Sequence, residues 1–363
     1  MSKVSIYERF EDLPEPCVAL FDKTSAVSGV FCSLPWFRHL AATVFDKNQR
    51  LRIYTVESDH PALVLPMCEE TPSKGVLAAR KLTAIANFYT AVFSPLVAEP
   101  ERGLQQNLHL VAGAIAADRP RWDTVDLHPM EEGTALFDGT LDAFRRAGMA
   151  AHSYFCFGNW YLEVKHRSYG EYFDSLPSKL KNTLKRKSRQ LEDGGRLQID
   201  LIAGGPDLAQ AIAAYEKIYQ SSWKIPEVYP DFIPGLIHVC AAQGWLRMGV
   251  AYIDGQPAAA QIWIVSQGVA SIYKLAYDEQ FSKFSVGSIL TARLMQHVID
   301  TDLVREVDFL SGDDPYKQDW MSHRRERRGI IAFNLRTVHG VFAALRHAAG
   351  QTWKNIAARR TGA

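Results

Sequence analysis

Two short stretches in the last third of the chain hold the side chains best suited to chemistry. In the first, Ser285-Val286-Gly287-Ser288 precedes a run of residues with helical spacing. The backbone N–H groups at the start of a helix are free and carry a partial positive charge, so this stretch would suit an anion such as a phosphate. Lys283 adds a cation, and Ser285 is a candidate cap for the helix. An ordinary capped helix with Gly287 in its first turn is the alternative interpretation.

The second stretch begins at Asp308 and ends at Trp320. Asp308 interrupts an apolar strand, where an unpaired carboxylate would be costly. It must therefore pair with Lys317 or another cation, or else serve as a base or a substrate anchor. Tyr316, Lys317 and Trp320 follow Pro315 in a short helical piece.

Four more residues are candidates for binding a substrate. Tyr273 and Lys274 are neighbours on an apolar strand, so their side chains should point to opposite faces, one of them into a cleft. Trp223 and Glu227 lie in a proline-containing turn at residues 221–232. Packing of this turn over the edge of a sheet is the alternative interpretation for either residue.

The composition of the 363-residue chain excludes several classes of protein. With a formal net charge of +1 and a pI near 7.7, the chain lacks the overall positive field with which nucleic-acid binders neutralise phosphates. The five cysteines form no CxxC pair and the eleven histidines show no metal-ligand spacing, so we expect neither a disulfide framework nor a metal. The longest apolar stretch, residues 258–265, is far shorter than the roughly 20 residues that span a membrane. Because no signal-peptide core is present either, we expect a cytoplasmic protein without a transmembrane segment.

The first half of the chain alternates between short strands and helices, which is typical of an α/β layer. Ser33 is the predicted cap of a helix that has Pro35 in its first turn. The remaining predicted elements are strands at 50–56, 62–67 and 124–127 and helices at 104–118 and 140–147. The chain is too long for one average domain, and the pattern changes at Phe157-Gly158-Asn159-Trp160, where we expect a domain boundary.

The second half is predicted to contain an antiparallel meander. Asp254-Gly255 joins the first two of three apolar runs, and this dipeptide is the strongest signal for a two-residue hairpin. The runs are residues 245–253, 257–265 and 270–277, preceded by helices at 178–192, 206–223 and 231–242 and a strand at 196–202. They are followed by a helix from Gly287 to about Asp300, a strand at 306–310, a short helix at 316–320 and a strand at 330–335.

This order of elements resembles the GNAT acyltransferase fold. More specifically, the segments YLEVKHRSYGEYFDSLPSKLKNTLKRKSRQLE and VDFLSGDDPYKQDW resemble the GNAT-related family named after the cellulose-biosynthesis protein CelD, a relative of the Fem peptidyltransferases. The resemblance covers residues 160–335 and implies a tandem GNAT-like α/β fold, with a mixed central sheet flanked by helices. Its domains would be a degenerate copy at 1–159, a functional copy at 160–337 and a basic amphipathic helix at 338–363.

The resemblance also implies roles for the candidate residues. Coenzyme A would carry the acyl group, with its pyrophosphate at the loop where the family has an Arg or Gln and two small residues; this chain has Ser282 and one glycine, Gly287. Tyr316 matches the tyrosine that protonates the departing thiolate, and Lys317 matches a lysine that stabilises negative charge. The implied catalytic residues are Tyr316, Asp308 and Lys317; the donor-binding residues are Lys283, Ser285, Val286, Gly287 and Ser288; the substrate-binding residues are Trp223, Glu227, Tyr273, Lys274 and Trp320.

The implied function is transfer of an acyl group from an acyl thioester, acyl-coenzyme A, to an amine or hydroxyl of a small molecule, sugar or polysaccharide precursor. Two alternatives remain open: a Fem-like transferase that uses aminoacyl-tRNA, and a non-catalytic scaffold in exopolysaccharide assembly. Basic clusters at 179–189 and 323–328 are either solvated faces or flank the cleft and attract an anionic ligand. The tail from Val338 has apolar residues at helical spacing, which would pack on its own domain or contact a membrane surface, a partner or a second copy of the chain.

Overall fold

The computed structural model describes residues 2–57, 61–70, 79–98 and 103–361, and the side chains of these residues except Pro61 and residues 351–361. The chain forms two compact units. Unit 1 comprises Met1–Cys156 and Glu326–Ala363, and unit 2 comprises Phe157–Arg325. The domain limits drawn from the sequence, 1–159, 160–337 and 338–363, remain a prediction about functional domains.

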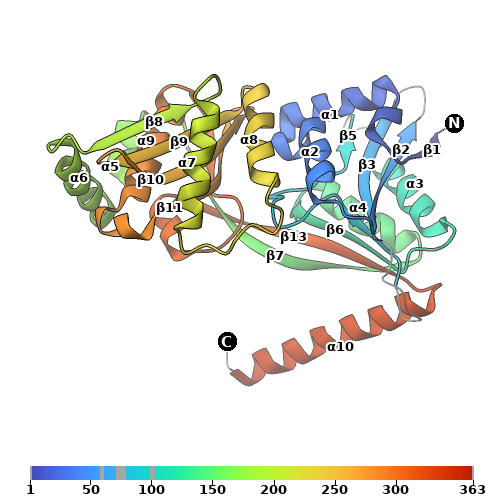
Figure 1. The fold of residues 1–363 in the computed structure, drawn as a ribbon. Coiled ribbons are helices and arrows are strands. Elements are labelled where there is room, and N and C mark those ends of the chain that lie inside the picture. The colour runs from blue at the N-terminus through green and yellow to red at the C-terminus, as the bar shows by residue number, and fades with distance from the viewer. Residues whose placement is uncertain (1, 58–60, 71–78, 99–102, 362–363) are drawn as a thin grey trace. The chain divides into compact units, whose positions relative to one another are not determined.

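Unit 1 is a mixed sheet with helices packed on it (Figure 1). Its elements are β1 (Lys3–Tyr7), η1 (Phe10–Asp12), α1 (Glu15–Ser28), η2 (Val30–Cys32), α2 (Leu34–Val44), β2 (Gln49–Glu57), β3 (Pro61–Glu70), β4 (Lys81–Ala84), β5 (Leu96–Val97), α3 (Leu104–Ala117), β6 (Thr124–Glu131), α4 (Ala135–Arg146), most of β7 (Met149–Glu163), most of β13 (His323–Asn334) and α10 (Val338–Thr361). The strands are ordered β1-β2-β3-β4-β6-β13, and β5 lies beside β3. Ser33 caps α2 as predicted, because its hydroxyl accepts a hydrogen bond from the backbone N–H of Trp36.

Unit 2 has the same construction, with the strand order β7-β12-β11-β10-β9-β8. Its elements are the end of β7, α5 (Tyr169–Ser175), α6 (Ser178–Glu192), β8 (Leu197–Ile202), α7 (Leu208–Gln220), α8 (Phe232–Ala242), β9 (Leu246–Ile253), β10 (Gln256–Ser266), β11 (Val269–Tyr277), η3 (Glu279–Phe284), α9 (Val286–Asp300), β12 (Glu306–Asp308), η4 (Pro315–Asp319) and the start of β13. Helices α7 and α8 cover one face of this sheet, and α5, α6 and α9 cover the other (Figure 1).

The predicted hairpin and meander of unit 2 are confirmed. Strands β9, β10 and β11 pair antiparallel in succession. At the first turn Asp254 and Gly255 have φ angles of 52° and 74°, which are the left-handed values that a tight two-residue hairpin requires. The predicted helix at 178–192 coincides with α6.

The two units repeat one order of elements. In unit 1 the antiparallel strands β2, β3 and β4 precede α3 and then β6, which pairs parallel with β4. In unit 2 the antiparallel strands β9, β10 and β11 precede α9 and then β12, which pairs parallel with β11. The repeated order is the one expected of two copies of a single fold.

The strand that follows each copy is exchanged between the units. Strand β7 follows α4 of unit 1, but its last residues pair with β12 of unit 2. Strand β13 follows η4 of unit 2, but its last residues pair with β6 of unit 1. Strand β7 is long, from Met149 to Glu163, and β13 begins at His323 rather than at the predicted Ile330. The alternation of apolar residues is weak at the start of β13, where charged residues find carboxylate partners within the fold.

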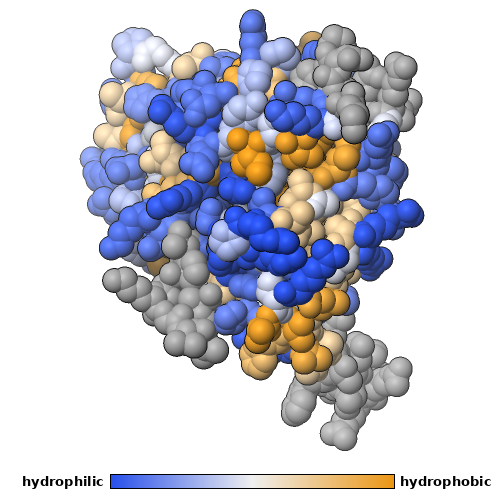
Figure 2. Space-filling model, turned by 90° about the vertical axis from the view of Figure 1, so that its right-hand side faces the viewer, coloured by the Kyte–Doolittle hydropathy of each residue, from blue (hydrophilic) through white to orange (hydrophobic). Residues whose placement is uncertain are grey.

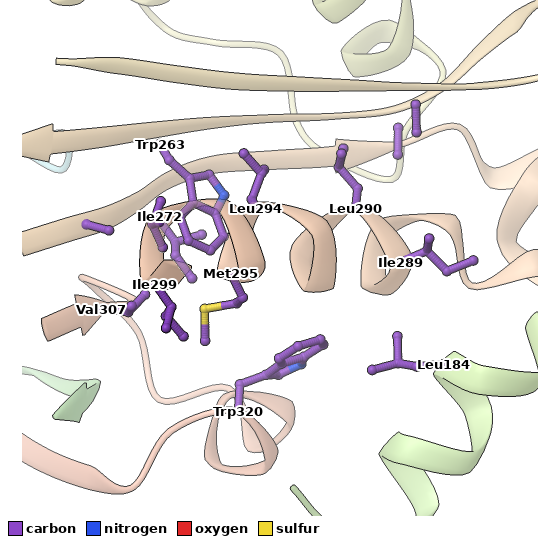
Figure 3. Packing of buried hydrophobic residues seen from close by; sticks show 14 of the residues in the cluster. Leu184, Trp263, Ile272, Ile289, Leu290, Leu294, Met295, Ile299, Val307 and Trp320 are labelled. Carbon is purple, nitrogen blue, oxygen red and sulfur yellow. The ribbon is translucent and has the colours of Figure 1, made fainter. Parts of the chain in front are cut away.

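The hydrophobic core of unit 2 lies between its sheet and α9. Leu290 and Leu294 of α9 face the strands, where Trp263 of β10 is fully buried, whereas Met295 points towards Trp320 and Ile289 lies on the side of Leu184 (Figure 3). This packing holds α9 firmly, and it therefore fixes where the first turn of α9 begins.

The face of the molecule shown in Figure 2 is largely hydrophilic, with a few hydrophobic patches. Helix α10 packs on its own unit through His347, whose ring centre lies 5.2 Å from that of His152 and 5.3 Å from that of Phe333. Phe342 and Leu345 are exposed. Contact of this helix with a membrane, a partner or a second copy stays a prediction, and the part of its apolar pattern beyond residue 350 lies outside the described side chains. Among the described residues, no helix has both the length and the apolar character needed to cross a membrane.

Candidate functional site

Strands β11 and β12 separate in the middle of the sheet of unit 2. They pair in parallel only where Val269–Ser271 lies opposite Glu306–Asp308. Strand β12 ends at Asp308, whereas β11 continues to Tyr277. The edge of β11 beyond Ser271 therefore extends past the end of its neighbour, and an extended ligand can lie along such a backbone edge.

A β-bulge lies in this part of β11. The register with β10 shifts between Ile262 and Trp263, and Tyr273 is the extra residue. A bulge bends the strand and redirects the side chains next to it. Lys274 is directed at the turn between α7 and α8, where its Nζ lies 2.5 Å from Oε1 of Glu227. The structure thus brings together two of the predicted substrate-binding residues.

The first turn of α9 lies beside the end of β11. A Cβ atom on Gly287 would lie 3.4 Å from Cδ1 of Tyr277, so the small residue allows this close approach. Ser285 occupies the cap position, but its φ of 56° is left-handed and its side chain makes no capping hydrogen bond. The suggested side-chain cap is therefore wrong, because a capping serine needs an extended backbone to reach the N–H groups of the first turn. Those N–H groups stay available to a ligand.

The other predicted donor-binding residues have different surroundings. Val286 is buried in the core, so it can offer only its backbone. Ser288 is half-buried in the first turn of α9, and Lys283 is exposed with its Nζ 5.1 Å from the ring centre of Phe284. Lys283 is the cation nearest in sequence to this helix start.

Tyr316 lies on η4 with its ring edge against Phe309, at 5.8 Å between ring centres. Its side chain remains accessible, since the residue is 45% exposed. Burial of the hydroxyl and, to a lesser degree, the Asp314 carboxylate raise the pKa of Tyr316 to about 12. The phenol is therefore protonated at neutral pH, as a proton donor must be.

Lys317 is the most buried of the candidate cations, with a side chain only 6% exposed. Its Nζ donates hydrogen bonds to the carbonyl oxygens of Ser311 at 2.6 Å and Gly312 at 3.2 Å, and lies 3.4 Å from the carboxylate of Asp314. Burial lowers the pKa of Lys317, although Asp314 opposes that effect. Lys317 thus fastens the loop after β12 and places a cation beside Tyr316.

Asp308 pairs with Arg325, not with Lys317. Arg325 Nη2 lies 2.6 Å from Oδ2 of Asp308, and Asn159 Nδ2 lies 2.5 Å from Oδ1. The backbone N–H of Leu310 donates a further hydrogen bond to Oδ1 at 2.6 Å. Arg325 also binds Glu306, and these two carboxylates outweigh burial to raise the pKa of Arg325. Because both oxygens of Asp308 are engaged, this residue is suited to holding the loop that follows β12.

The basic run at 323–328 lies largely within the fold and is not a solvated face. Arg324 makes a bidentate ion pair with Asp313, which also accepts a hydrogen bond from the indole of Trp160. Arg327 is 6% exposed in unit 1. The sequence alone suggests a charged surface here, because the carboxylates that pair with these arginines are not adjacent to them in the sequence.

Trp223 lies against the end of β11, with its ring centre 4.5 Å from that of Tyr277. Trp223 therefore connects the turn between α7 and α8 to the same tyrosine that Gly287 approaches. Trp320 has different surroundings: it is 5% exposed and lies in the core near Met295 (Figure 3). The core position leaves little of Trp320 for a substrate to touch, because the indole packs against apolar side chains.

Sequence reasoning missed three residues of this site: Asn159, Lys224 and Arg325. Lys224 lies in the turn between Trp223 and Glu227, within electrostatic reach of Lys274 and Lys317. Because a buried Asp308 needs a cation, the sequence did predict that a basic residue pairs with it. Nothing local in the sequence distinguishes Arg325 from the basic residues next to it. Among the described residues, no group of three or more histidines, cysteines, aspartates or glutamates could hold a metal ion.

Comparisons with known proteins concern the fold and the segment that contains these residues. Residues 178–318, which lie within unit 2, match the family model described as an acetyltransferase (GNAT) domain. A search of curated proteins gives no match.

Three solved structures share the fold over almost the whole chain. FemX has a TM-score of 0.61 at 8% identity, covering 90% of this chain and 96% of that chain. The C-terminal domain of a putative lysylphosphatidylglycerol synthetase from Agrobacterium fabrum has a TM-score of 0.53 at 11% identity, covering 92% and 95%. A tandem GNAT protein from the clavulanic acid biosynthesis pathway has a TM-score of 0.51 at 12% identity, covering 90% and 98%.

These findings define the class of protein. The chain has a tandem GNAT-like α/β fold, as the resemblance implied, and residues 178–318 of its second unit match a GNAT domain, which supports acyl transfer in general. Identities this low show the fold alone, and the more specific resemblance to the CelD-named family stays a prediction.

Proposed function

We propose that this protein is an N- or O-acyltransferase whose working site lies in unit 2, with acyl-coenzyme A as the donor. The observation that supports the proposal best is the separation of β11 from β12 beside the first turn of α9, inside the segment that matches a GNAT domain. The acceptor would be an amine or hydroxyl on a small molecule, sugar or polysaccharide precursor, and the reaction would take place in the cytoplasm.

The donor would be held at two places. Its pyrophosphate would bind the backbone N–H groups at Ser285–Ser288, with Lys283 as the nearby cation. Its extended arm would lie along β11 beyond Ser271, next to the bulge at Tyr273. Tyr277, at the end of β11, lies next to Gly287 in the first turn of α9, so the two proposed binding places adjoin each other.

The chemical step needs a proton donor and a stabilised negative charge. The acceptor nitrogen or oxygen would attack the thioester carbonyl, a new C–N or C–O bond would form, and the C–S bond would break. Tyr316 would protonate the departing thiolate, and Lys317 would stabilise negative charge beside it. The proton that the acceptor loses balances the proton that the thiol gains, so no further reactant is required. Asp308 would act by positioning the loop that carries both residues.

The acceptor side would be formed by the turn between α7 and α8 and by β11. Trp223, Glu227, Tyr273 and Lys274 are the residues proposed there. Trp320 is left out because it lies in the core. A Fem-like transferase with aminoacyl-tRNA as donor and a non-catalytic scaffold are the competing functions.

Calorimetry with acetyl-coenzyme A tests the proposal. We expect the wild-type protein to bind, and we expect Ser288→Asp to weaken binding at least about tenfold, since a carboxylate at the helix start repels a pyrophosphate. The same substitution favours the helix itself by about 0.3–1 kcal/mol, so loss of binding is not loss of folding. Gln210→Asp, at the matching position of α7, is the control and should bind like the wild type. If the wild-type protein does not bind acetyl-coenzyme A even at millimolar concentration, the proposal is wrong and the two competing functions gain support.

A further inference from the structure

The turn between α7 and α8 is attached to β11 at two points on either side of Lys224. Before it in sequence, Trp223 lies against Tyr277. After it, Glu227 forms a 2.5 Å ion pair with Lys274. Lys224 is therefore held over the part of β11 that extends past β12.

This ion pair is well protected from water. The side chains of Lys274 and Glu227 are 18% and 13% exposed. Glu227 also acts on Tyr219 of α7, where burial first and then a hydrogen bond with Glu227 raise the pKa of the phenol. The carboxylate of Glu227 therefore acts on Lys274, Tyr219 and Lys224 together, so it offsets the charge of Lys224 only in part.

The charges around Lys224 do not balance. Its ammonium group is within electrostatic reach of Lys274, Lys317, Glu227 and Asp314, which makes three cations and two carboxylates. Lys274 and Lys317 have carboxylate partners within 4 Å. The Nζ of Lys224 lies 5.8 Å from the ring centre of Trp223 and makes no hydrogen bond or ion pair with any residue that the structure describes. Burial and the neighbouring ammonium of Lys274 lower the pKa of Lys224 to about 8, as expected for a cation that lacks an anion.

We propose that Lys224 binds an anionic group of the acyl acceptor, a carboxylate or a phosphate, and that the Lys274–Glu227 pair positions it. The inference that this ligand is the acyl acceptor rests on the proposed function. Lys317 is next to Tyr316 in the chain. Because Lys224 is within electrostatic reach of Lys317, the ammonium of Lys224 lies toward the end of the site where Tyr316 would act. The phosphates of the donor would instead lie at the first turn of α9. A group with one negative charge would balance the set of five charges formed by Lys224 and its four neighbours, and would keep the ammonium of Lys224 protonated.

Binding of two probes, succinate and inorganic phosphate, tests the proposal. We expect the wild-type protein to bind at least one of them, and the tighter probe indicates the class of anion. Lys224→Met should weaken this binding about tenfold or more, because it removes a charged hydrogen-bond donor, whereas Lys224→Arg should restore most of it. Lys217→Met, which removes an exposed lysine of α7, is the matched control and should bind like the wild type.

The dependence of binding on pH gives a second test. Because the free lysine loses its proton as the pH rises through about 8, wild-type affinity for the anion should fall above that pH. Lys224→Arg stays charged, so its affinity should remain level up to pH 10. A wild-type protein that binds neither probe, or Lys224→Met binding as tightly as the wild type, would overturn the proposal.

Acetyl-coenzyme A separates this inference from the proposed function. Lys224→Met should bind acetyl-coenzyme A with the wild-type affinity, since the donor phosphates lie at α9. If the wild-type protein binds the small anions through Lys224 but does not bind acetyl-coenzyme A, the anion site stands and the donor assignment fails. If Lys224→Met loses acetyl-coenzyme A and the small anions together, Lys224 belongs to the donor site and the acceptor assignment is wrong.

Discussion

The Asp308 carboxylate has three hydrogen-bond donors around it, from Arg325, Asn159 and the backbone of Leu310. A carboxylate in that position has little capacity left to accept a proton from a substrate. Its effect on chemistry is indirect, because the same loop carries Tyr316 and Lys317. The candidate residues therefore fall into two groups: those that hold the loop after β12, and those that would face a ligand.

Removing the arginine should be strongly destabilising. Arg325→Met leaves Asp308, whose side chain is 8% exposed, without its cation, and we expect a loss of about 3–5 kcal/mol in the free energy of unfolding. The double variant Arg325→Met/Asp308→Asn should recover part of this loss, since residue 308 then carries no charge and Glu306, the other partner of Arg325, is more exposed at 20%. Urea unfolding measures both. Arg146→Met, which breaks an exposed pair of 2.7 Å with Asp142, should cost less than about 1 kcal/mol. Equal losses for Arg325→Met and Arg146→Met would show that the Asp308 network contributes no more than a surface pair.

Tyr316→Phe tests the proton donor. Loss of a positioned acid should lower the single-turnover rate by roughly 10²–10⁴-fold while binding of acetyl-coenzyme A is unchanged. Because the pKa of Tyr316 is about 12, its deprotonation should cause no fall in the wild-type rate between pH 7 and pH 10. An unchanged rate, under conditions where the chemical step limits turnover, would rule out this role.

At the scale of elements, the position of α9 determines where the proposed binding site for the donor pyrophosphate lies. The helix can approach the sheet closely because Gly249 of β9 has no side chain. A Cβ atom there would lie 2.8 Å from Cδ1 of Leu290 and 3.0 Å from Cδ1 of Leu294. Packing that is this tight does not accept another methyl group without movement of the helix.

Gly249→Ala should therefore destabilise unit 2 by about 1–3 kcal/mol through overpacking. The matched control is Gly113→Ala in α3, where a Cβ atom would meet nothing within 4 Å. A glycine inside a helix costs about 0.5–1 kcal/mol relative to alanine, so this variant should be more stable than the wild type. Thermal unfolding compares the two. A Gly249→Ala variant as stable as the wild type would show that α9 can move away from β9 at no cost.

For the whole molecule, the chain passes from unit 1 to unit 2 within β7 and returns within β13. A fragment cut at 160 and 337 would keep the residues of β7 that pair with β12, but it would cut β7 within its length and carry the unit-1 part of β13. Unit 1 is made of two separate segments of the chain, and unit 2 begins and ends inside strands that continue into unit 1. Every test above should therefore use the full chain.

The cysteines report on the folding of both units together. Cys17, Cys32, Cys68 and Cys240 are buried and Cys156 is half-buried. Burial raises the pKa of the Cys156 thiol to about 11 and that of Cys32 to about 12, so little thiolate exists at pH 8. We expect at most one thiol to react quickly with Ellman's reagent in the folded protein, and all five of the sequence in denaturant. Rapid reaction of two or more thiols without denaturant would show that one unit opens under native conditions.

Several elements were predictable because their signals are local. The helix at 178–192 follows from apolar spacing, and the hairpin at Asp254-Gly255 follows from the left-handed backbone that a tight turn needs. The meander, α9 and η4 were placed in the correct order for the same reason. The candidate residues Glu227 and Lys274 were both named from the sequence, but their direct contact was not, because they are separated by 47 positions.

The amino-acid sequence by itself determined the order of helices and strands and the stretches that open α9 and form η4, since these depend on residues within a few positions of one another, while the tandem arrangement was expected from the resemblance to the GNAT fold. Only the tertiary structure decided that Asp308 pairs with Arg325 and Asn159, that β7 and β13 are exchanged, and that Lys224 lies among other lysines. Hydrogen bonds and charges act over a few ångströms whatever the separation along the chain. Which of many arginines or lysines comes within that range is fixed by how the strands pair.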